Sequence, residues 1–254
     1  MCKTDYGLYY FPIETAAMNI NDLNPEEAKE AARLLLSNSL FHMCHFLGYT
    51  EVNLQTHAEI IAALESLHQR KLVVVPRGAF KSSIGSIVYP IWCLVRNPNE
   101  RILIDSEIYS NSVLYLRVIK EHLKSEQFVE VFGDYEGNIW QEGSITIKPR
   151  TKRFKEPSIT CGGVGTTRVG MHYDRIIADD YNSPANTRTK DMAQQVIDHF
   201  KYNLSILEPE GEYVVIGTRY SEDDLIGFIL REILGQKDLS EGKFNKGLIG
   251  GNNG

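Results

Sequence analysis

Hydrophobic positions recur at helical spacing in the first part of the chain, after an opening stretch expected to be irregular. The stretch Asn24–Glu27 combines a capping asparagine, a proline at the first helical position and acids in the first turn, and predicts a helix to about Ser37. A short apolar segment over 40–47 ends at Gly48. Thr56 is expected to cap a third helix with apolar residues at helical spacing.

From Lys71 onward, short apolar runs alternate with amphipathic segments. The apolar runs predict strands at 72–75, 101–105, 144–149, 158–163, 174–180 and 212–220. The segments between them predict helices at 82–95, 110–125 and 189–204, the first of which should bend or end near Pro90. Alternation of helices with nearly continuous apolar strands indicates an α/β fold with a parallel sheet covered on both faces.

Composition limits the classes of function. The chain has 254 residues and a net charge of −6, so it is one large domain or a domain with an extension, and any nucleic-acid contact must come from a local patch. No apolar run reaches the length of a membrane span. No C-x-x-C pair occurs, which argues against a zinc ribbon and favours idle thiols in a reducing cytoplasm. The four cysteines are Cys2, Cys44, Cys93 and Cys161.

The stretch "KLVVVPRGAFKSSIG", 71–85, has the outline of a phosphate-binding loop: a strand, a turn with one glycine, and Lys-Ser at a helix start. The usual pattern is G-x-x-x-x-G-K-[ST], and here Val75 and Phe80 take the two glycine positions. Lys81 could reach terminal phosphates and Ser82 could contact magnesium. Taken alone, a chance Lys-Ser after a strand is an equal alternative.

Two further motifs follow in the order that a nucleotide hydrolase requires. Asp179 and Asp180 end the predicted strand in "DRIIADD", at the edge where parallel sheets bind ligands. One carboxylate could hold magnesium through water and the other could orient the attacking water. Thr218, in "VVIGTRY", ends the last strand and could sense the terminal phosphate. A helix cap and a plain turn are the structural alternatives for these two motifs.

Together the stretches "VVVPRGAFKSS", "RIIADD" and "VVIGTRYSEDDL" resemble the large terminase subunit of tailed bacteriophages, the ATP-driven motor that packs DNA into the capsid. The resemblance covers roughly 55–230. It implies a P-loop NTPase of the additional-strand, catalytic-acid type, with a mainly parallel sheet flanked by helices. Residues 1–54 would form an N-terminal helical extension and 55–235 the ATPase core. Residues 236–254 would be a linker or the truncated start of the following region, with the nuclease domain absent.

The resemblance also implies roles for individual residues. Lys81 would hold the β- and γ-phosphates, Arg77 would contact the γ-phosphate side, and Ser82 would ligate magnesium. Asp179 would hold magnesium through water, and Asp180 stands where many members have the glutamate that orients the attacking water. Thr218 would couple hydrolysis to motion. The implied ATP-binding residues are Pro76, Arg77, Gly78, Ala79, Phe80, Lys81, Ser82 and Ser83, with Gln55 and His57 as adenine candidates or, equally, helix-cap residues.

Family motors assemble as rings in which a neighbouring subunit lends an arginine to the transition state. Arg168 is our choice for that arginine because it lies in the loop before the carboxylate strand; Arg175 and Arg219 compete with it. The resemblance implies a homo-oligomeric ring, a pentamer, on the procapsid, with a monomer as the alternative for the isolated chain. It also implies the portal protein and the small terminase subunit as partners, no membrane, and the host cell cytoplasm as location.

The run "KPRTKRFK", 148–155, is the densest positive patch in this acidic chain. A loop that grips the DNA backbone needs this charge without base-reading geometry. A solvated hairpin is the alternative of equal weight. The cations of the run are Lys148, Arg150, Lys152, Arg153 and Lys155.

The sequence therefore predicts an ATP- and Mg²⁺-dependent motor domain that drives double-stranded DNA into a procapsid. No DNA cleavage is expected, since the last residues of the chain lack a carboxylate cluster for two metals. The alternatives are a helicase-like or repair DNA translocase, and a nucleotide-sensing interaction protein without turnover. Asp180 discriminates against the last of these, because binding alone requires no second carboxylate.

Overall fold

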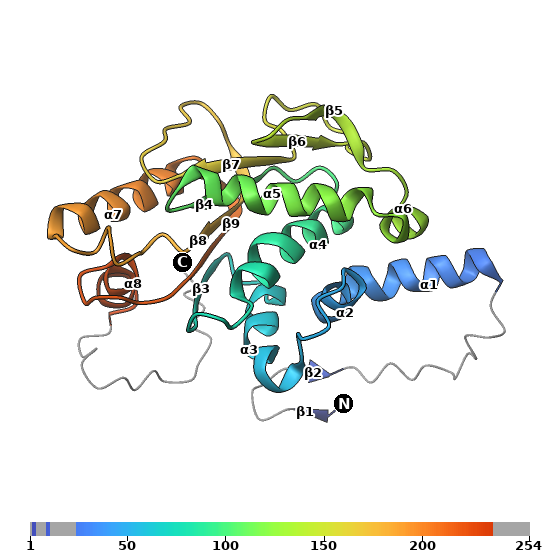
Figure 1. The fold of residues 1–254 in the computed structure, drawn as a ribbon, viewed down its shortest axis with the longest axis horizontal. Helices are drawn as coiled ribbons and strands as arrows, with labels where there is room; N and C mark the ends of the chain where they lie inside the picture. Colours follow the sequence, from blue (N-terminus) through green and yellow to red (C-terminus); the bar gives the residue numbers. More distant parts are fainter. Residues whose placement is uncertain (1, 4–8, 11–23, 236–254) are drawn as a thin grey trace.

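The computed structural model describes residues 2–3, 9–10 and 24–235. A seven-stranded sheet forms its centre, in the order β3-β9-β8-β4-β7-β6-β5 (Figure 1). The strands are β3 (Arg70–Val74), β4 (Ile102–Ser106), β5 (Glu136–Trp140), β6 (Ser144–Ile147), β7 (Ile159–Gly163), β8 (Tyr173–Asp179) and β9 (Leu207–Gly217). The strands from β3 to β7 in this order run parallel, and β6 and β5 extend the sheet antiparallel. In the N-terminal stretch expected to be irregular, β1 (Cys2–Lys3) pairs antiparallel with β2 (Tyr9–Tyr10).

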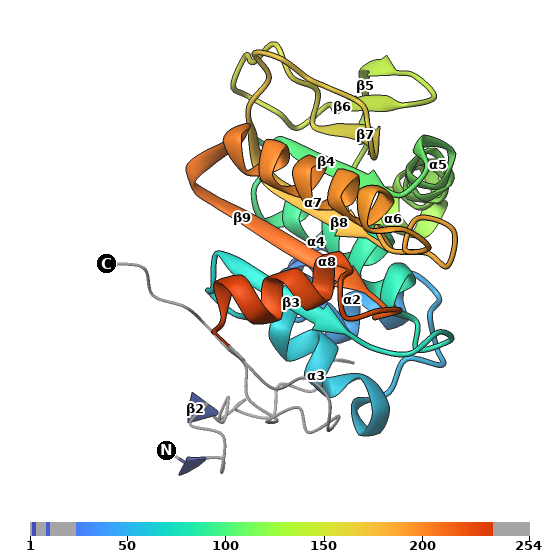
Figure 2. The same cartoon turned by 90° about the vertical axis from the view of Figure 1, so that its left-hand side faces the viewer.

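Helices cover both faces of the sheet, as Figures 1 and 2 show. One face carries α1 (Pro25–Asn38), α2 (Leu40–Phe46), α3 (Leu54–Glu65), the π-helical η2 (Ser83–Val88), α4 (Tyr89–Arg96), α5 (Tyr109–Lys124) and α6 (Glu126–Phe132). The other carries α7 (Lys190–Ser205), α8 (Leu225–Phe228) and η3 (Ile229–Ile233). Along β4, Ile102 and Ile104 pack into the first core and Leu103 into the second, because successive strand residues face opposite sides. The mixed α/β architecture expected from the sequence is therefore confirmed, with β5, α6, α8 and η3 added.

Local sequence explains where several helices begin. The Asn24 side chain accepts hydrogen bonds from the backbone N–H groups of Glu26 and Glu27, and Glu27 caps Asn24 in return. The third helix begins earlier than expected, because Asn53 rather than Thr56 caps it. This cap adds a turn to α3.

The helix after the phosphate loop, expected to bend or end near Pro90, continues through this residue. Proline lacks the N–H that would continue the α-helical ladder. The preceding turn is π-helical, with the Tyr89 N–H bonded to the carbonyl of Ile84. A wider turn of this kind absorbs the missing donor, so η2 and α4 form one helical rod.

The expected N-terminal extension is part of the same core as the sheet. Leu36 of α1 and Leu40 and Met43 of α2 are buried in one hydrophobic cluster with Ile91 and Ile104. The helices α1 and α2 thus pack on the sheet, and the boundary at residue 54 stays a prediction. Residues 236–254, expected to be a linker, lie outside the described residues.

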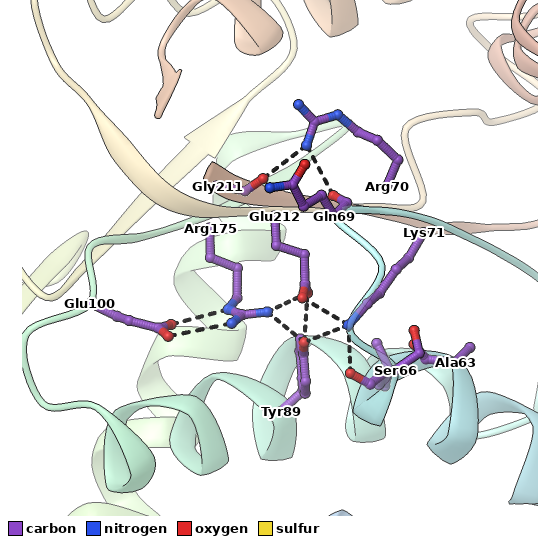
Figure 3. Close-up of polar contacts among 11 residues, drawn as sticks. Ala63, Ser66, Gln69, Arg70, Lys71, Tyr89, Glu100, Arg175, Gly211 and Glu212 are labelled. Carbon is purple, nitrogen blue, oxygen red and sulfur yellow. Dashed lines mark hydrogen bonds and ion pairs between the residues drawn. The ribbon is translucent and has the colours of Figure 1, made fainter. Parts of the chain in front are cut away.

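Buried charges lie at the edge of the sheet where the parallel strands begin (Figure 3). Glu212 of β9 accepts from the Lys71 ammonium at 2.8 Å and from the Tyr89 hydroxyl at 2.6 Å, and it forms a second ion pair with Arg175. Arg175 also pairs with Glu100 at 3.1 Å. This network ties β3, β9, β8 and α4 together.

Among the described residues, no helix combines the length and the apolar character needed to cross a bilayer.

We expect Glu212→Gln to lower the free energy of unfolding by about 3 kcal/mol, since it leaves the buried Lys71 ammonium without its ionic partner. Glu136→Gln is the matched control, because it removes the Lys124–Glu136 pair, which is exposed on both sides. The control should change stability by less than about 1 kcal/mol. Urea unfolding followed by circular dichroism measures both, and equal effects would contradict a stabilising role for the network.

Candidate functional site

The phosphate-loop candidate connects the carboxyl end of β3 to η2. Gly78 has φ +82 and Phe80 has φ +52, so two residues of this turn lie in the left-handed region. Glycine adopts that conformation freely, which accounts for the glycine that the usual pattern has at the position of Phe80. Here the Phe80 ring packs edge-on against the His57 ring, with 5.7 Å between the ring centroids.

The structure brings the loop and the carboxylate motif together. Lys81 is 6% exposed, and its ammonium lies 2.9 Å from a carboxylate oxygen of Asp180. Asp180 itself has φ +45, and its N–H bonds to the carbonyl of Ile216 on β9 at 2.8 Å. The sharp left-handed turn after β8 thus directs the Asp180 side chain toward the loop.

Asp179 is fully buried at the end of β8, and neither of its carboxylate oxygens has a hydrogen-bond partner among the described residues. Burial raises the pKa of Asp179 to about 6, and the charge of Asp180 adds to the rise. The hydroxyls of Ser82, Tyr115 and Ser86 lie beside the carboxylate and oppose this rise. Buried oxygens without partners next to a helix-start serine suit a hydrated cation, so Ser82 and Asp179 fit a magnesium site.

The tip of β9 contacts the same loop. The Thr218 hydroxyl donates to the carbonyl of Val75 at 3.0 Å, which joins the predicted coupling residue to the loop's first residues. Arg77 is exposed and donates from Nε to the Tyr220 hydroxyl at 2.9 Å. This bond connects the phosphate-loop candidate to the tip of β9.

The two adenine candidates lie in different surroundings. Gln55 is exposed near the start of α3. His57 is 4% exposed, and its Nδ1 lies 3.1 Å from the backbone nitrogen of Asn53. The His57 side chain thus contacts the Asn53 cap and the Phe80 ring. Its contact with adenine stays a prediction.

The three candidate arginines differ in the groups that they contact. The Arg168 guanidinium donates to the carbonyl of Cys161 at 2.8 Å, so in this structure it is bound within its own subunit. Arg175 belongs to the buried network at the opposite edge. Arg219 lies in the loop after β9, where its Nε donates to the carbonyl of Ser221 at 3.3 Å. Of the three, Arg219 lies on the segment that carries Thr218.

The basic run forms the connection between β6 and β7, before the start of the parallel strand β7. It therefore lies at the edge of the sheet opposite the phosphate loop. Three of its cations have partners: Lys148 pairs with Asp134 at 2.6 Å, Arg150 donates to the carbonyl of Glu156, and Lys155 donates to the carbonyl of Gly170. Within the described chain, Lys152 and Arg153 are exposed and form no ion pair. These two are the cations of the run that remain available to a polyanion.

Three polar residues near Asp179 were not predicted. Ser86 and Ser106 are fully buried with unpartnered hydroxyls, and Tyr115 of α5 brings its hydroxyl beside Asp179. Ser86 follows Ser82 by four residues, which is a sequence signal for a shared helix face. Nothing in the sequence marks Tyr115, because its position depends on how α5 packs on the sheet.

No protein-family profile matches the chain, and no curated protein matches it. Solved structures that resemble this chain include two of a Dbp5 variant. One is a variant of Saccharomyces cerevisiae Dbp5 bound to Nup159, a Gle1 variant, IP6 and ADP, with a TM-score of 0.47 and 10% identity over 78% of this chain and 50% of that chain. The other is the Dbp5 variant bound to the Gle1 variant and IP6, with a TM-score of 0.41 and 12% identity over 68% of this chain and 43% of that one. The chain thus spans half or less of the length of these structures.

We expect magnesium-dependent ATP binding to weaken as the pH falls through about 6. The raised pKa means that Asp179 in the metal-free site takes up a proton there, and a protonated carboxyl binds the cation poorly. The unfolded chain takes up this proton only at lower pH, so in the metal-free protein this group favours folding more strongly as the pH drops. Mg²⁺ titration of a fluorescent ATP analogue at several pH values measures the binding. A half-saturating Mg²⁺ concentration that stays constant through pH 6 would contradict the assignment.

Proposed function

We propose that this chain is an ATP-hydrolysing motor domain of the terminase type. The observation that carries the ATPase proposal is the 2.9 Å contact between Lys81 and Asp180, because it joins a phosphate-loop motif to a carboxylate motif distant in sequence. A structural Lys-Ser turn would not require an adjacent buried carboxylate with free oxygens. The sheet order supports the additional-strand type, since β9 lies between the loop strand β3 and the carboxylate strand β8.

In this proposal, the chain's own groups exchange partners when nucleotide binds. Lys81 leaves Asp180 and neutralises phosphate oxygens, while the N–H groups at the start of η2 face the phosphates. Asp180, released from the ammonium, accepts a hydrogen bond from the attacking water and orients it. Ser82 and, through water, Asp179 would hold Mg²⁺, which neutralises charge on the phosphates.

DNA translocation is the finer part of the proposal. It is supported by the order of the three motifs and by the Thr218–Val75 link between the loop and β9. The exposed cations Lys152 and Arg153 would contact the phosphate backbone of duplex DNA, away from the nucleotide site. A ring of copies on a procapsid, with the portal protein and the small terminase subunit, would place this surface along the DNA.

We expect Lys81→Ala to abolish ATP hydrolysis and to weaken ATP binding strongly, because it removes the main cation facing the phosphates. Asp180→Asn should keep ATP binding and lose turnover by about a hundredfold or more, since an amide cannot accept the proton. Asp223→Asn, a change at an exposed acid, is the control. Release of inorganic phosphate and binding of a fluorescent ATP analogue are the measurements. Normal hydrolysis by Lys81→Ala would rule out the phosphate-loop assignment, and turnover by Asp180→Asn would rule out the division of roles.

We expect the double change Lys152→Ser/Arg153→Ser to weaken duplex DNA binding without changing ATP affinity. Two lost phosphate contacts should lower the slope of log affinity against log salt by about two. Lys148→Ser should have a smaller effect, because Lys148 is already paired with Asp134. Lys190→Ser/Lys201→Ser removes the same charge from α7 as a control. Fluorescence anisotropy of labelled duplex DNA over a salt series measures these slopes. Equal slopes for Lys152→Ser/Arg153→Ser and Lys190→Ser/Lys201→Ser would place the DNA contact elsewhere.

A further inference from the structure

The Asp179 carboxylate lies within a group of hydroxyls that its proposed role does not use. Asp179 of β8 is the register partner of Ser106 at the end of β4. Register partners on neighbouring parallel strands direct their side chains to the same face of the sheet. Ile177 and Ile104, two residues earlier on each strand, pack into the core beneath η2 and α5, so Asp179 and Ser106 face those helices.

Two helices complete the group from above. Ser86 of η2 is fully buried, and its hydroxyl has no partner among the described residues. Tyr115 of α5 packs its ring against the same core and brings its hydroxyl beside Ser82 and Asp179. Three elements, β4, η2 and α5, thus bring hydroxyls to the face of the sheet that carries this buried carboxylate.

A buried polar group without a hydrogen bond lowers stability, and the core could have used alanine at either serine. Several such groups around one buried carboxylate therefore suit a polar ligand such as a hydrated ion. The described part of the chain has no group of three His, Cys, Asp or Glu side chains that could enclose a bare ion. Magnesium, however, keeps several of its waters, and each water must donate hydrogen bonds outward.

We propose that Tyr115, Ser86 and Ser106 form the outer shell of the magnesium site and accept hydrogen bonds from water on the ion. Tyr115 is in addition a positioning residue, which holds the Asp179 carboxylate in the orientation that the hydrated ion requires. This inference rests on the proposed ATPase function, because the ion enters with the nucleotide. It adds residues that lie outside the motifs from which that function was deduced.

Tyr115→Phe removes the hydroxyl and keeps the ring. Binding of a fluorescent ATP analogue is measured first in EDTA and then during Mg²⁺ titration. We expect an unchanged affinity in EDTA and a half-saturating Mg²⁺ concentration raised about tenfold. Tyr135→Phe is the matched control, because Tyr135 is a buried tyrosine packed on Phe128, and it should leave both values unchanged.

Parent-like Mg²⁺ dependence in Tyr115→Phe overturns the proposal, as does an equal loss of affinity with and without metal. If the parent itself binds no ATP under either condition, the ATPase function fails and the inference falls with it. Ser106→Ala provides a second measurement. It should raise the half-saturating Mg²⁺ concentration while leaving the thermal unfolding midpoint in EDTA unchanged or higher, since an unpartnered hydroxyl is lost. A lower midpoint with unchanged Mg²⁺ dependence would make the serine hydroxyl purely structural.

Discussion

The parallel, in-register pairing of β3, β9, β8 and β4 is the constraint on which the candidate site depends. Val74 pairs with Gly217, and Asp179 pairs with both Ile216 and Ser106, so four strands end at one edge. Each strand end continues into a loop that carries polar chemistry. A shift of β8 by one residue against β4 and β9 would turn Asp179 toward the opposite core.

The two edges of the sheet differ in whether their buried polar groups have partners. At the edge where the strands begin, Lys71, Arg175 and Glu212 satisfy one another, and the network joins helices to strands. At the other edge, Asp179 and Ser106 are buried with unpartnered oxygens. Paired charges satisfy one another's desolvation, whereas buried polar groups without partners reduce stability and provide binding capacity for a ligand. The proposed nucleotide site therefore uses the edge that the fold leaves unsatisfied.

Backbone strain is located at the same edge. Phe80 and Asp180 are the non-glycine residues with positive φ in the described chain. Phe80 directly precedes Lys81, and Asp180 is the partner of Lys81 in the ion pair. Such conformations cost energy and persist only where the surroundings enforce them. Phe80 packs against the His57 ring, and the Asp180 N–H bonds to the carbonyl of Ile216. Nucleotide binding could release the ion pair without disturbing either support.

The α/β class, the strands of the parallel sheet and the ends of several helices could be predicted from the sequence, because apolar periodicity and capping residues act locally. The sequence also marked Lys81, Asp179 and Asp180, since each lies directly beside a strand end or helix start. Features that depend on packing between distant segments could not be predicted in this way. Such packing places His57 against Phe80 and bonds the Arg168 guanidinium to the carbonyl of Cys161. It also packs 24–54 on the core and places the basic run at the edge opposite the phosphate loop. Tyr115 belongs to this second group, because a helix's own sequence fixes which residues share a face but not what that face meets.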